Sequence, residues 1–460
     1  MSDGVVAMSH LAGLDAARVE AFFDAEAAAY TAARPQSRAL AGKLADGFYD
    51  GVPMHWMRDW PMPFAMFVAQ ARGAAITDVD GHVLADFCLG DTGSMFGHSP
   101  EPVARAIAAQ ASRGLTYMLP TPAAAEIGPL LRRRFGLPHW QVATTASDAN
   151  RFALRVARAV TGRGKILIFN GCYHGTVDET FVRLIDGKPA HRPGLLGQAS
   201  DLTANTVVVE FNDVPTLEAA LAGGDIACVI TEPVLTNSAM VLPQPGFHTA
   251  LRDLTRHAGT LLLIDETHTI STGPGGYCAR HGLEPDIFVL GKPVAGGIPA
   301  SVWGFTQDVA ERLDAVRART PAGHSGMGTT LSANALALAA MQATLSEVMS
   351  EEAYAHMEAL AGHLEEGLGA AIHSAALPWH VARVGARVEF IFAPEPLCNG
   401  SEAEATHIPA IERALHLGLL NRGVLIAPFH NMMLICPATR AQDVSRLVEA
   451  FGSVLAALKS

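Results

Sequence analysis

The sequence predicts an α/β fold: a mostly parallel sheet with helices on both faces, accompanied by a smaller α+β domain. The first observation is that apolar, strand-like runs alternate with helical patterns through the middle of the chain. The second is that two of these runs end in an acid and a lysine, and open α/β sheets place their functional residues at the carboxyl ends of strands. The third is size, because 460 residues, nearly half of them apolar, suffice for two domains.

The N-terminal part of the chain precedes the predicted sheet. Residues 15–33 form an Ala-rich amphipathic pattern, and a second helical pattern covers residues 37–48. Residues 52–63 are rich in Met, Trp and Pro and are expected to form a loop. Residues 73–89 are predicted to form a hairpin, since Asp80-Gly81 is a strong turn signal between two short runs. His98 is expected to pack in a turn.

The predicted sheet follows. Its strands are expected at residues 165–169, 206–210, 227–231, 261–264, 287–290 and 301–305. The helices of this region are expected at residues 101–112, 214–222 and 247–258, with one more after residue 145. Residues 178–204 are expected to form a long loop.

The C-terminal part is expected to form the smaller domain. A helical pattern over residues 334–368 is predicted to be one long helix that links to it. Strands are then expected at residues 387–393 and 424–428, and helices at 408–421 and 441–458. The predicted organisation is therefore an N-terminal segment with a loop near the site (1–72), a large domain (73–335), and the linking helix with a small domain (336–460).

Asp265 and Lys292 carry the clearest chemical signal. Each also has a purely structural alternative. Asp265 could cap a turn after its strand, and Lys292 could lay its aliphatic stem on apolar surface with its amine in water. However, Lys292 alone among the five lysines is embedded in apolar and glycine residues, where an unpaired amine is costly. An acid and a lysine at successive strand ends match pyridoxal phosphate, which forms a Schiff base with a lysine and needs an acid near its ring nitrogen.

The residues around this pair resemble a known family. Asp265-Glu266-Thr267 and the later stretch Gly291-Lys292-Pro293-Val294-Ala295-Gly296-Gly297-Ile298-Pro299 are similar to motifs of the class III pyridoxal-phosphate aminotransferases. Within that family they are most similar to the glutamate-1-semialdehyde 2,1-aminomutase group, and the resemblance extends from about Gly73 to the C-terminus. It implies fold-type I with a seven-stranded type of sheet, pyridoxal 5′-phosphate as cofactor, and a homodimer with shared active sites.

The resemblance also implies which residues hold the cofactor phosphate. Thr145-Ala146-Ser147 stands where the family has Ser-Gly-Thr at a helix start, so Ala146 and Ser147 are expected to bind the phosphate. The alternative is an ordinary helix N-cap. Thr330 matches the family's threonine that reaches the phosphate of the neighbouring subunit.

Other residues are expected around the cofactor ring by the same resemblance. Gly171-Cys172-Tyr173-His174-Gly175 matches the family's Gly-x-Tyr-His-Gly, so Tyr173 is expected to stack on the ring and His174 to orient the loop. Thr267 or His268 is expected at the opposite ring face. Asp265 is expected to pair with the ring nitrogen.

Two residues are candidates for the substrate. Glu232, in Glu232-Pro233-Val234, matches the family's Glu-Pro-Val and either shapes the site or caps the next turn. Arg58 is the nearest match to the family's arginine for the substrate carboxylate, and the alternative is a surface charge.

These residues predict an aminotransferase that moves an amino group between an amino acid or related amine and a keto acid or aldehyde. An aminomutase or an amino-acid racemase on the same scaffold is an alternative, and so is a member without catalytic activity. The aminomutase has a glycine-rich mobile lid, which would retain a released intermediate. The corresponding residues 185–200 carry Pro189 and Pro193 and no Gly-Ser-Gly run, which favours transfer between two substrates.

The composition argues against several other classes of protein. The formal net charge is −12 and there is no basic run, so nucleic acid is not expected as a partner. We expect no membrane span, no signal peptide and no metal site, since apolar runs are short and no Cys or His residues have ligand spacing. The six cysteines form no CxxC motif, which favours reduced thiols and a cytoplasmic enzyme.

Overall fold

The computed structural model describes residues 10–427 and 430–459. Two compact units make up the chain: one comprises the residues up to 100, 352–396 and those from 406 onward, and the other comprises 101–351 and 397–405. The bounds differ from the predicted division at residues 72 and 335. Residues 73–100 group with the C-terminal part because strand β5 (Val83–Asp86) pairs in parallel with β17 (Val424–Leu425).

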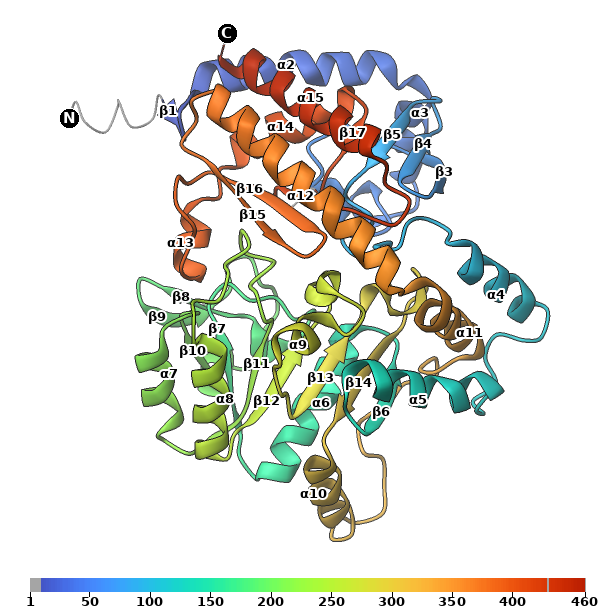
Figure 1. Ribbon diagram of the computed structural model, residues 1–460, viewed down its shortest axis with the longest axis vertical. Coiled ribbons are helices and arrows are strands. Elements are labelled where there is room, and N and C mark those ends of the chain that lie inside the picture. Colours follow the sequence, from blue (N-terminus) through green and yellow to red (C-terminus); the bar gives the residue numbers. More distant parts are fainter. Residues whose placement is uncertain (1–9, 428–429, 460) are drawn as a thin grey trace. The chain divides into compact units, whose positions relative to one another are not determined.

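The central unit contains the predicted seven-stranded sheet (Figure 1). Its strands are, in spatial order, β10 (Thr206–Val209), β7 (Lys165–Phe169), β11 (Ile226–Thr231), β12 (Leu261–Asp265), β13 (Ile287–Leu290), β14 (Ser301–Phe305) and β6 (His139–Ala143). Only β14 runs antiparallel to its neighbours. The mostly parallel fold is thus confirmed.

Continuous apolar runs explain why these segments form the inner strands. Every residue of β11, β12 and β13 is buried, as expected for parallel strands covered on both faces. Helices α6 (Ala146–Thr161) and α8 (Phe247–Ala258) pack on this sheet. The other helices of the unit are α4 (Glu101–Ala111), α5 (Pro122–Phe135), α7 (Val214–Leu221), α9 (Gly276–His281), α10 (Gln307–Arg317), α11 (Ala335–Ala343) and α13 (Gly400–Ala405).

Part of the loop predicted over residues 178–204 is a hairpin. Strands β8 (Val182–Ile185) and β9 (Lys188–His191) pair antiparallel. Asp186 and Gly187 both have positive φ (50° and 72°), which is the requirement of a tight two-residue hairpin turn. The loop prediction was wrong here because the Asp-Gly signal, although present, was not combined with the short runs beside it.

The helix predicted over residues 334–368 is interrupted. Helix α11 ends in a π-helical turn (Thr344–Val348), and α12 (Glu351–Ser374) begins after Met349 leaves the helical region (ψ 65°). The Thr344 hydroxyl donates to the Ala340 carbonyl at 2.8 Å, and the Met349 amide donates to Thr344. The Thr344 side-chain bond competes with the helical ladder, and the Met349 bond belongs to the π-helical turn, so a continuous apolar pattern did not give one helix.

The other unit contains two small sheets with helices. The sheets have the strand orders β15-β16-β18 and β17-β5-β4-β3, the second of which includes the predicted hairpin. The remaining strands are β1 (His10–Leu11), β2 (Leu14–Asp15), β3 (Val68–Arg72), β4 (Ala75–Asp78), β15 (His380–Val384), β16 (Arg387–Ile391) and β18 (Met432–Leu434). The helices, besides α12, are α2 (Ala16–Ala33), α3 (Pro35–Leu44), α14 (Pro409–Asn421) and α15 (Ala441–Lys459).

Pro35 begins α3 at its first turn rather than only ending α2, as suits a proline at that position. His98 packs in a turn as expected, where Nε2 lies 2.7 Å from the Asp86 carboxylate. The predicted strand over 424–428 is shorter than expected, and Pro428 lies outside the described residues, as does the N-terminal stretch 1–9.

Candidate active site

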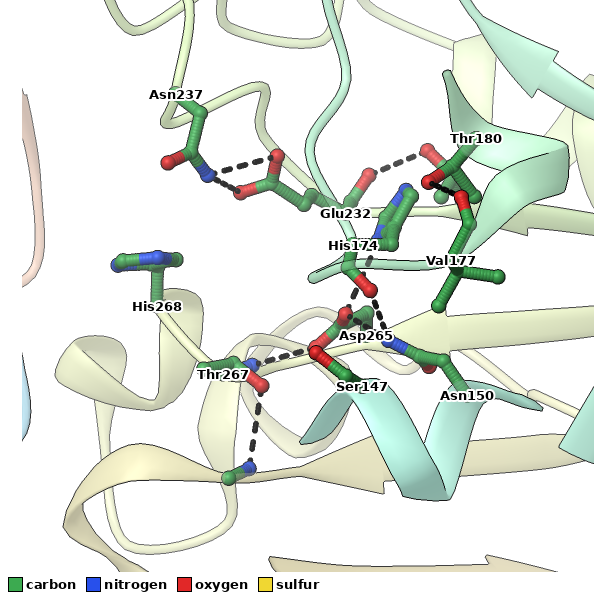
Figure 2. A network of polar contacts seen from close by, with 12 residues as sticks. Ser147, Asn150, His174, Val177, Thr180, Glu232, Asn237, Asp265, Thr267 and His268 are labelled. Carbon is green, nitrogen blue, oxygen red and sulfur yellow. Dashed lines mark hydrogen bonds and ion pairs between the residues drawn. The ribbon is translucent and has the colours of Figure 1, made fainter. Parts of the chain in front are cut away.

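Asp265 lies at the carboxyl end of β12. The residue is only 4% exposed, so its carboxylate is buried. It accepts hydrogen bonds from Asn150 Nδ2 at 2.9 Å, from His174 Nδ1 at 3.0 Å and from the Thr267 amide at 3.1 Å (Figure 2). Burial alone would raise the pKa of Asp265, but these donors hold that pKa below its usual range. The carboxylate is therefore charged at neutral pH.

His174 is the charged partner of Asp265. Burial alone would lower the pKa of His174, but the neighbouring Cys172 thiol and the Asp265 carboxylate raise this pKa to about 10. The pair is thus an imidazolium and a carboxylate within the buried core. From the sequence, His174 was expected only to orient its loop. In the structure it also favours the charged form of Asp265, to which it is paired.

Lys292 lies at the end of the neighbouring strand. Strands β12 and β13 pair in parallel, with Asp265 opposite Val289, and Lys292 follows β13 after Gly291. The amide of Gly291 donates to the Thr267 hydroxyl at 3.1 Å, which ties the two strand ends together. Lys292 itself has φ 42°, an uncommon conformation for a residue with a Cβ that often marks a functional position. Its Nζ is 2.8 Å from His268 Nε2.

The start of helix α6 lies beside Lys292. Thr145 caps the helix by accepting from the Asp148 amide, and other first-turn amides have no partner within the helix. A Cβ on Gly291 would lie 2.7 Å from the Ala146 Cβ, so the alanine that replaces the family's glycine fits only because residue 291 is glycine. The N-cap alternative is therefore seen at Thr145, and phosphate binding by Ala146 and Ser147 stays a prediction.

Ser147 is tied to the loop that carries His174. Its hydroxyl accepts from the Thr176 amide at 2.9 Å. Gly175 (φ 79°) packs so closely on Ser147 that a Cβ would meet the serine hydroxyl at 2.1 Å. Glycine is therefore required at this position of the Tyr-His-Gly motif. Tyr173 is 38% exposed, and the Arg192 guanidinium lies 5.9 Å from its ring centroid.

Glu232 follows β11 and is buried. It accepts hydrogen bonds from Thr236. It also accepts from Asn237 Nδ2 at 3.4 Å, a contact that Figure 2 shows. Burial raises the pKa of Glu232, although Thr236 and His174 act in the opposite direction. These contacts favour the turn-capping alternative, and a role toward substrate stays a prediction.

Two expected site residues are not joined to this network. Arg58 belongs to the other compact unit, where it forms an ion pair with Asp50 at 2.9 Å. Thr330 lies in an exposed turn of the central unit, beside Thr329, which contacts Thr144. Their roles toward substrate and toward a neighbouring subunit stay predictions.

Asn150 belongs to the site but was not predicted from the sequence. It follows Ser147 by three residues on α6, so the two lie on the same helical face. That spacing was available in the sequence, but the contact with Asp265 joins residues 115 positions apart. No periodicity within one element could have revealed it.

The residues present fit pyridoxal phosphate. Asp265 offers a fixed negative charge for a protonated ring nitrogen, Lys292 offers an amine on the adjacent strand end, and the start of α6 offers amides and a dipole for a phosphate. Among the described residues there is no group of three or more His, Cys, Asp or Glu residues that could hold a metal ion. No described helix is both long and apolar enough to cross a membrane.

A pH-dependent stability follows from the His174–Asp265 pair. The pKa of His174 is higher when the protein is folded (about 10) than when it is unfolded (about 6.5). The stabilisation is therefore complete below about pH 6.5 and is lost as the pH rises toward 10. His174→Gln should lower the free energy of unfolding by about 3 kcal/mol at pH 6 and by less at pH 9.5. Denaturant titrations at both values measure this, and an equal loss at both would contradict the charge assignment.

Comparison with known proteins agrees with this geometry. The family model for class III aminotransferases matches residues 57–455. Glutamate-1-semialdehyde 2,1-aminomutase of Anaeromyxobacter dehalogenans (strain 2CP-C) is 33% identical over 390 residues, which are 84% of this chain and 89% of that protein. The corresponding enzyme of Desulfitobacterium hafniense (strain DSM 10664 / DCB-2) is 33% identical over 399 residues, covering 85% of this chain and 91% of that one.

Solved structures show the same likeness. A crystal structure described as a glutamate-1-semialdehyde-aminomutase from Pseudomonas aeruginosa PAO1 has a TM-score of 0.95 and 50% identity, covering 97% of this chain and all of that chain. A β-phenylalanine aminotransferase from Variovorax paradoxus has a TM-score of 0.83 and 26% identity, covering 95% and 97%. The predicted resemblance is confirmed: this chain belongs to the class III aminotransferase family.

Proposed function

We propose that this protein is a pyridoxal-phosphate-dependent aminotransferase that moves an amino group between an amino acid, or a related amine, and a keto acid or aldehyde. The observation that carries the proposal is the placement of Asp265 and Lys292 at the ends of neighbouring strands, which are joined by the 3.1 Å hydrogen bond from the Gly291 amide to the Thr267 hydroxyl. Bound pyridoxal phosphate supplies a ring that withdraws electrons from the carbon carrying the amino group.

The residues of the chain have distinct parts in this function. Asp265, charged and fixed by His174, Asn150 and Thr267, holds a proton on the ring nitrogen. The Lys292 amine binds the cofactor covalently and, once freed, carries a proton from the substrate carbon. Tyr173 is proposed to stack on the ring.

The remaining proposed roles concern the phosphate and the substrate. Ala146 and Ser147 bind the phosphate at the start of α6, and Thr330 does so from a second copy of the chain. Arg58 is proposed to hold a substrate carboxylate, and Glu232 to shape the site beside it.

An aminomutase is the second candidate, and the names of the relatives favour it. The likeness at 50% identity to the Pseudomonas aeruginosa structure is the strongest support for this alternative. We favour transfer between two substrates because the segment expected to act as a lid is folded and tethered. Residues 188–191 form β9, and His191 Nε2 accepts from the Leu202 amide at 3.1 Å.

The two candidates differ in whether the amino group leaves with the first product. With one amino donor and no acceptor, an aminotransferase should convert its cofactor fully to the pyridoxamine form, and a keto acid should then restore the original absorbance. A screen of amino acids and amines against the purified protein, followed by spectrophotometry, measures both half-reactions. Rapid conversion of glutamate-1-semialdehyde to 5-aminolevulinate without donor or acceptor would instead establish the aminomutase.

We also propose that the protein is a homodimer, located in the cytoplasm. An apolar patch in the central unit supports the dimer, because exposed apolar surface of this kind marks interfaces. The patch consists of Tyr117, Met118 and Leu119, each between 44% and 78% exposed. It adjoins the turn that carries Thr330, since Tyr117, Met118, Leu119 and Thr330 line one concave surface. Six thiols without a disulfide support the location, which cell fractionation tests.

A charge in the apolar patch should weaken the dimer. Burying a methionine side chain is worth about 1.5–3 kcal/mol, so Met118→Asp should raise the dimer dissociation constant about tenfold or more. Leu196→Asp is the matched control, since Leu196 is exposed (89%) but lies outside the patch. Analytical ultracentrifugation compares the three proteins. A fully active wild-type monomer at assay concentration would refute both the dimer and the role of Thr330.

A further inference from the structure

His268 is placed directly against the amine of Lys292. Its Nε2 is 2.8 Å from Lys292 Nζ, and the histidine is 4% exposed. Figure 2 shows His268 projecting from the segment that follows Thr267. A contact of this length between two nitrogens is a hydrogen bond, in which one nitrogen is the donor and the other the acceptor.

The backbone on both sides of His268 is fixed. On one side, Thr267 donates to Asp265 through its amide and accepts from Gly291 through its hydroxyl. On the other side, the Ser271 amide donates to the His268 carbonyl at 3.2 Å. The backbone from which the imidazole projects toward Lys292 is therefore held by the same contacts that join the two strand ends.

The acids and the second histidine at this edge of the sheet are engaged elsewhere. Glu266 accepts from the amides of Tyr277 and Cys278 at 3.0 and 2.6 Å, and burial raises the pKa of Glu266. Glu232 accepts from Thr236, and Asp265 is paired with His174. The imidazole at hydrogen-bond distance from Lys292 is that of His268, and an imidazole can accept a proton and return it near neutral pH.

We propose that His268 is a catalytic residue that accepts a proton from the Lys292 amine; this inference rests on the proposed function. An ammonium group has only donors, so Nε2 accepts and Nδ1 carries the ring proton. In the transfer, an Nζ–H bond breaks and its electron pair stays on Nζ, while the Nε2 lone pair forms a new N–H bond. The charge of +1 stays within the pair.

This transfer gives Lys292 the lone pair that both of its roles require. A neutral amine is needed to attack the cofactor, and also to take a proton from the substrate carbon. Because the acceptor is a neighbouring side chain, the proton need not leave to solvent. Lys292 becomes an ammonium group when it takes the substrate proton and is neutral again once it has passed that proton on. The proton held on His268 can then return to Nζ and restore the starting state.

Two substitutions separate proton acceptance from hydrogen bonding. His268→Phe keeps a planar ring but removes both nitrogens, whereas His268→Gln keeps an acceptor that does not take up a proton near neutral pH. His139→Phe is the matched control. His139 lies at the start of β6, in the same unit but at the opposite end of the sheet, and its Nε2 is 2.7 Å from Gln307 Oε1.

The first readout needs no turnover. Trace acetylation across pH 5–11, followed by peptide mass spectrometry, measures how reactive the Lys292 amine is, with the other four lysines as internal standards. The acetylation is performed on the full-length protein, both free of cofactor and loaded with pyridoxamine phosphate. The wild-type and His139→Phe proteins should give a Lys292 curve with a second inflection in the range of histidine titration, about pH 6–7. Both His268 variants should lack that inflection.

The second readout is the rate of the amino-donor half-reaction against pH. His268→Phe should slow it by about 10–100-fold, a typical size for a lost acid–base group. His268→Gln should recover part of the rate but not the wild-type pH dependence. The proposal is overturned if the acetylation curves of wild type and both variants coincide, or if His268→Gln restores both rate and pH dependence. If no donor reacts at all, the proposed function fails, while the acetylation of cofactor-free protein still decides the role of His268.

Discussion

The buried charge of Asp265 is the constraint on which the rest of the site depends. A carboxylate enclosed in the core is costly unless it is paired and hydrogen-bonded. Here three donors come from three segments that are distant in sequence: Asn150 from α6, His174 from the loop after β7, and Thr267 from the loop after β12. Removing any of them would leave part of that charge unsatisfied, so the three segments are held together by one carboxylate.

The same contacts place Lys292. Thr267 donates to Asp265 and accepts from the Gly291 amide, so this one residue links the end of the acid's strand to the end of the lysine's strand. Gly291 has a second part, since only a residue without a Cβ leaves room for Ala146 at the start of α6. The same set of contacts therefore fixes the positions of Asp265, of Lys292 and of the start of α6.

Much of this arrangement was predictable from the sequence, because its signals are local. The inner strands are short apolar runs, and β7, β13 and β14 have the predicted bounds. The acid and lysine follow such runs directly, so their placement needed only the rule for parallel strands. The fold and the family were confirmed for the same reason.

What escaped prediction depends on contacts between distant segments or on competing local bonds. Asn150 and the Lys292–His268 contact join segments that no periodicity relates. The interruption after α11 comes from hydroxyl groups bonding to their own helix. Arg58 was chosen by resemblance in a region of loose correspondence; within its own unit it pairs with Asp50, and its role toward substrate stays a prediction.

Lys292 is the residue to which we expect pyridoxal phosphate to be attached. The most direct measurement is borohydride reduction of the protein loaded with this cofactor, followed by proteolysis and peptide mapping. The account predicts the label on Lys292 alone, because this amine is fixed at the strand end next to Asp265. A label on Lys43, Lys165, Lys188 or Lys459 in place of Lys292 would contradict it.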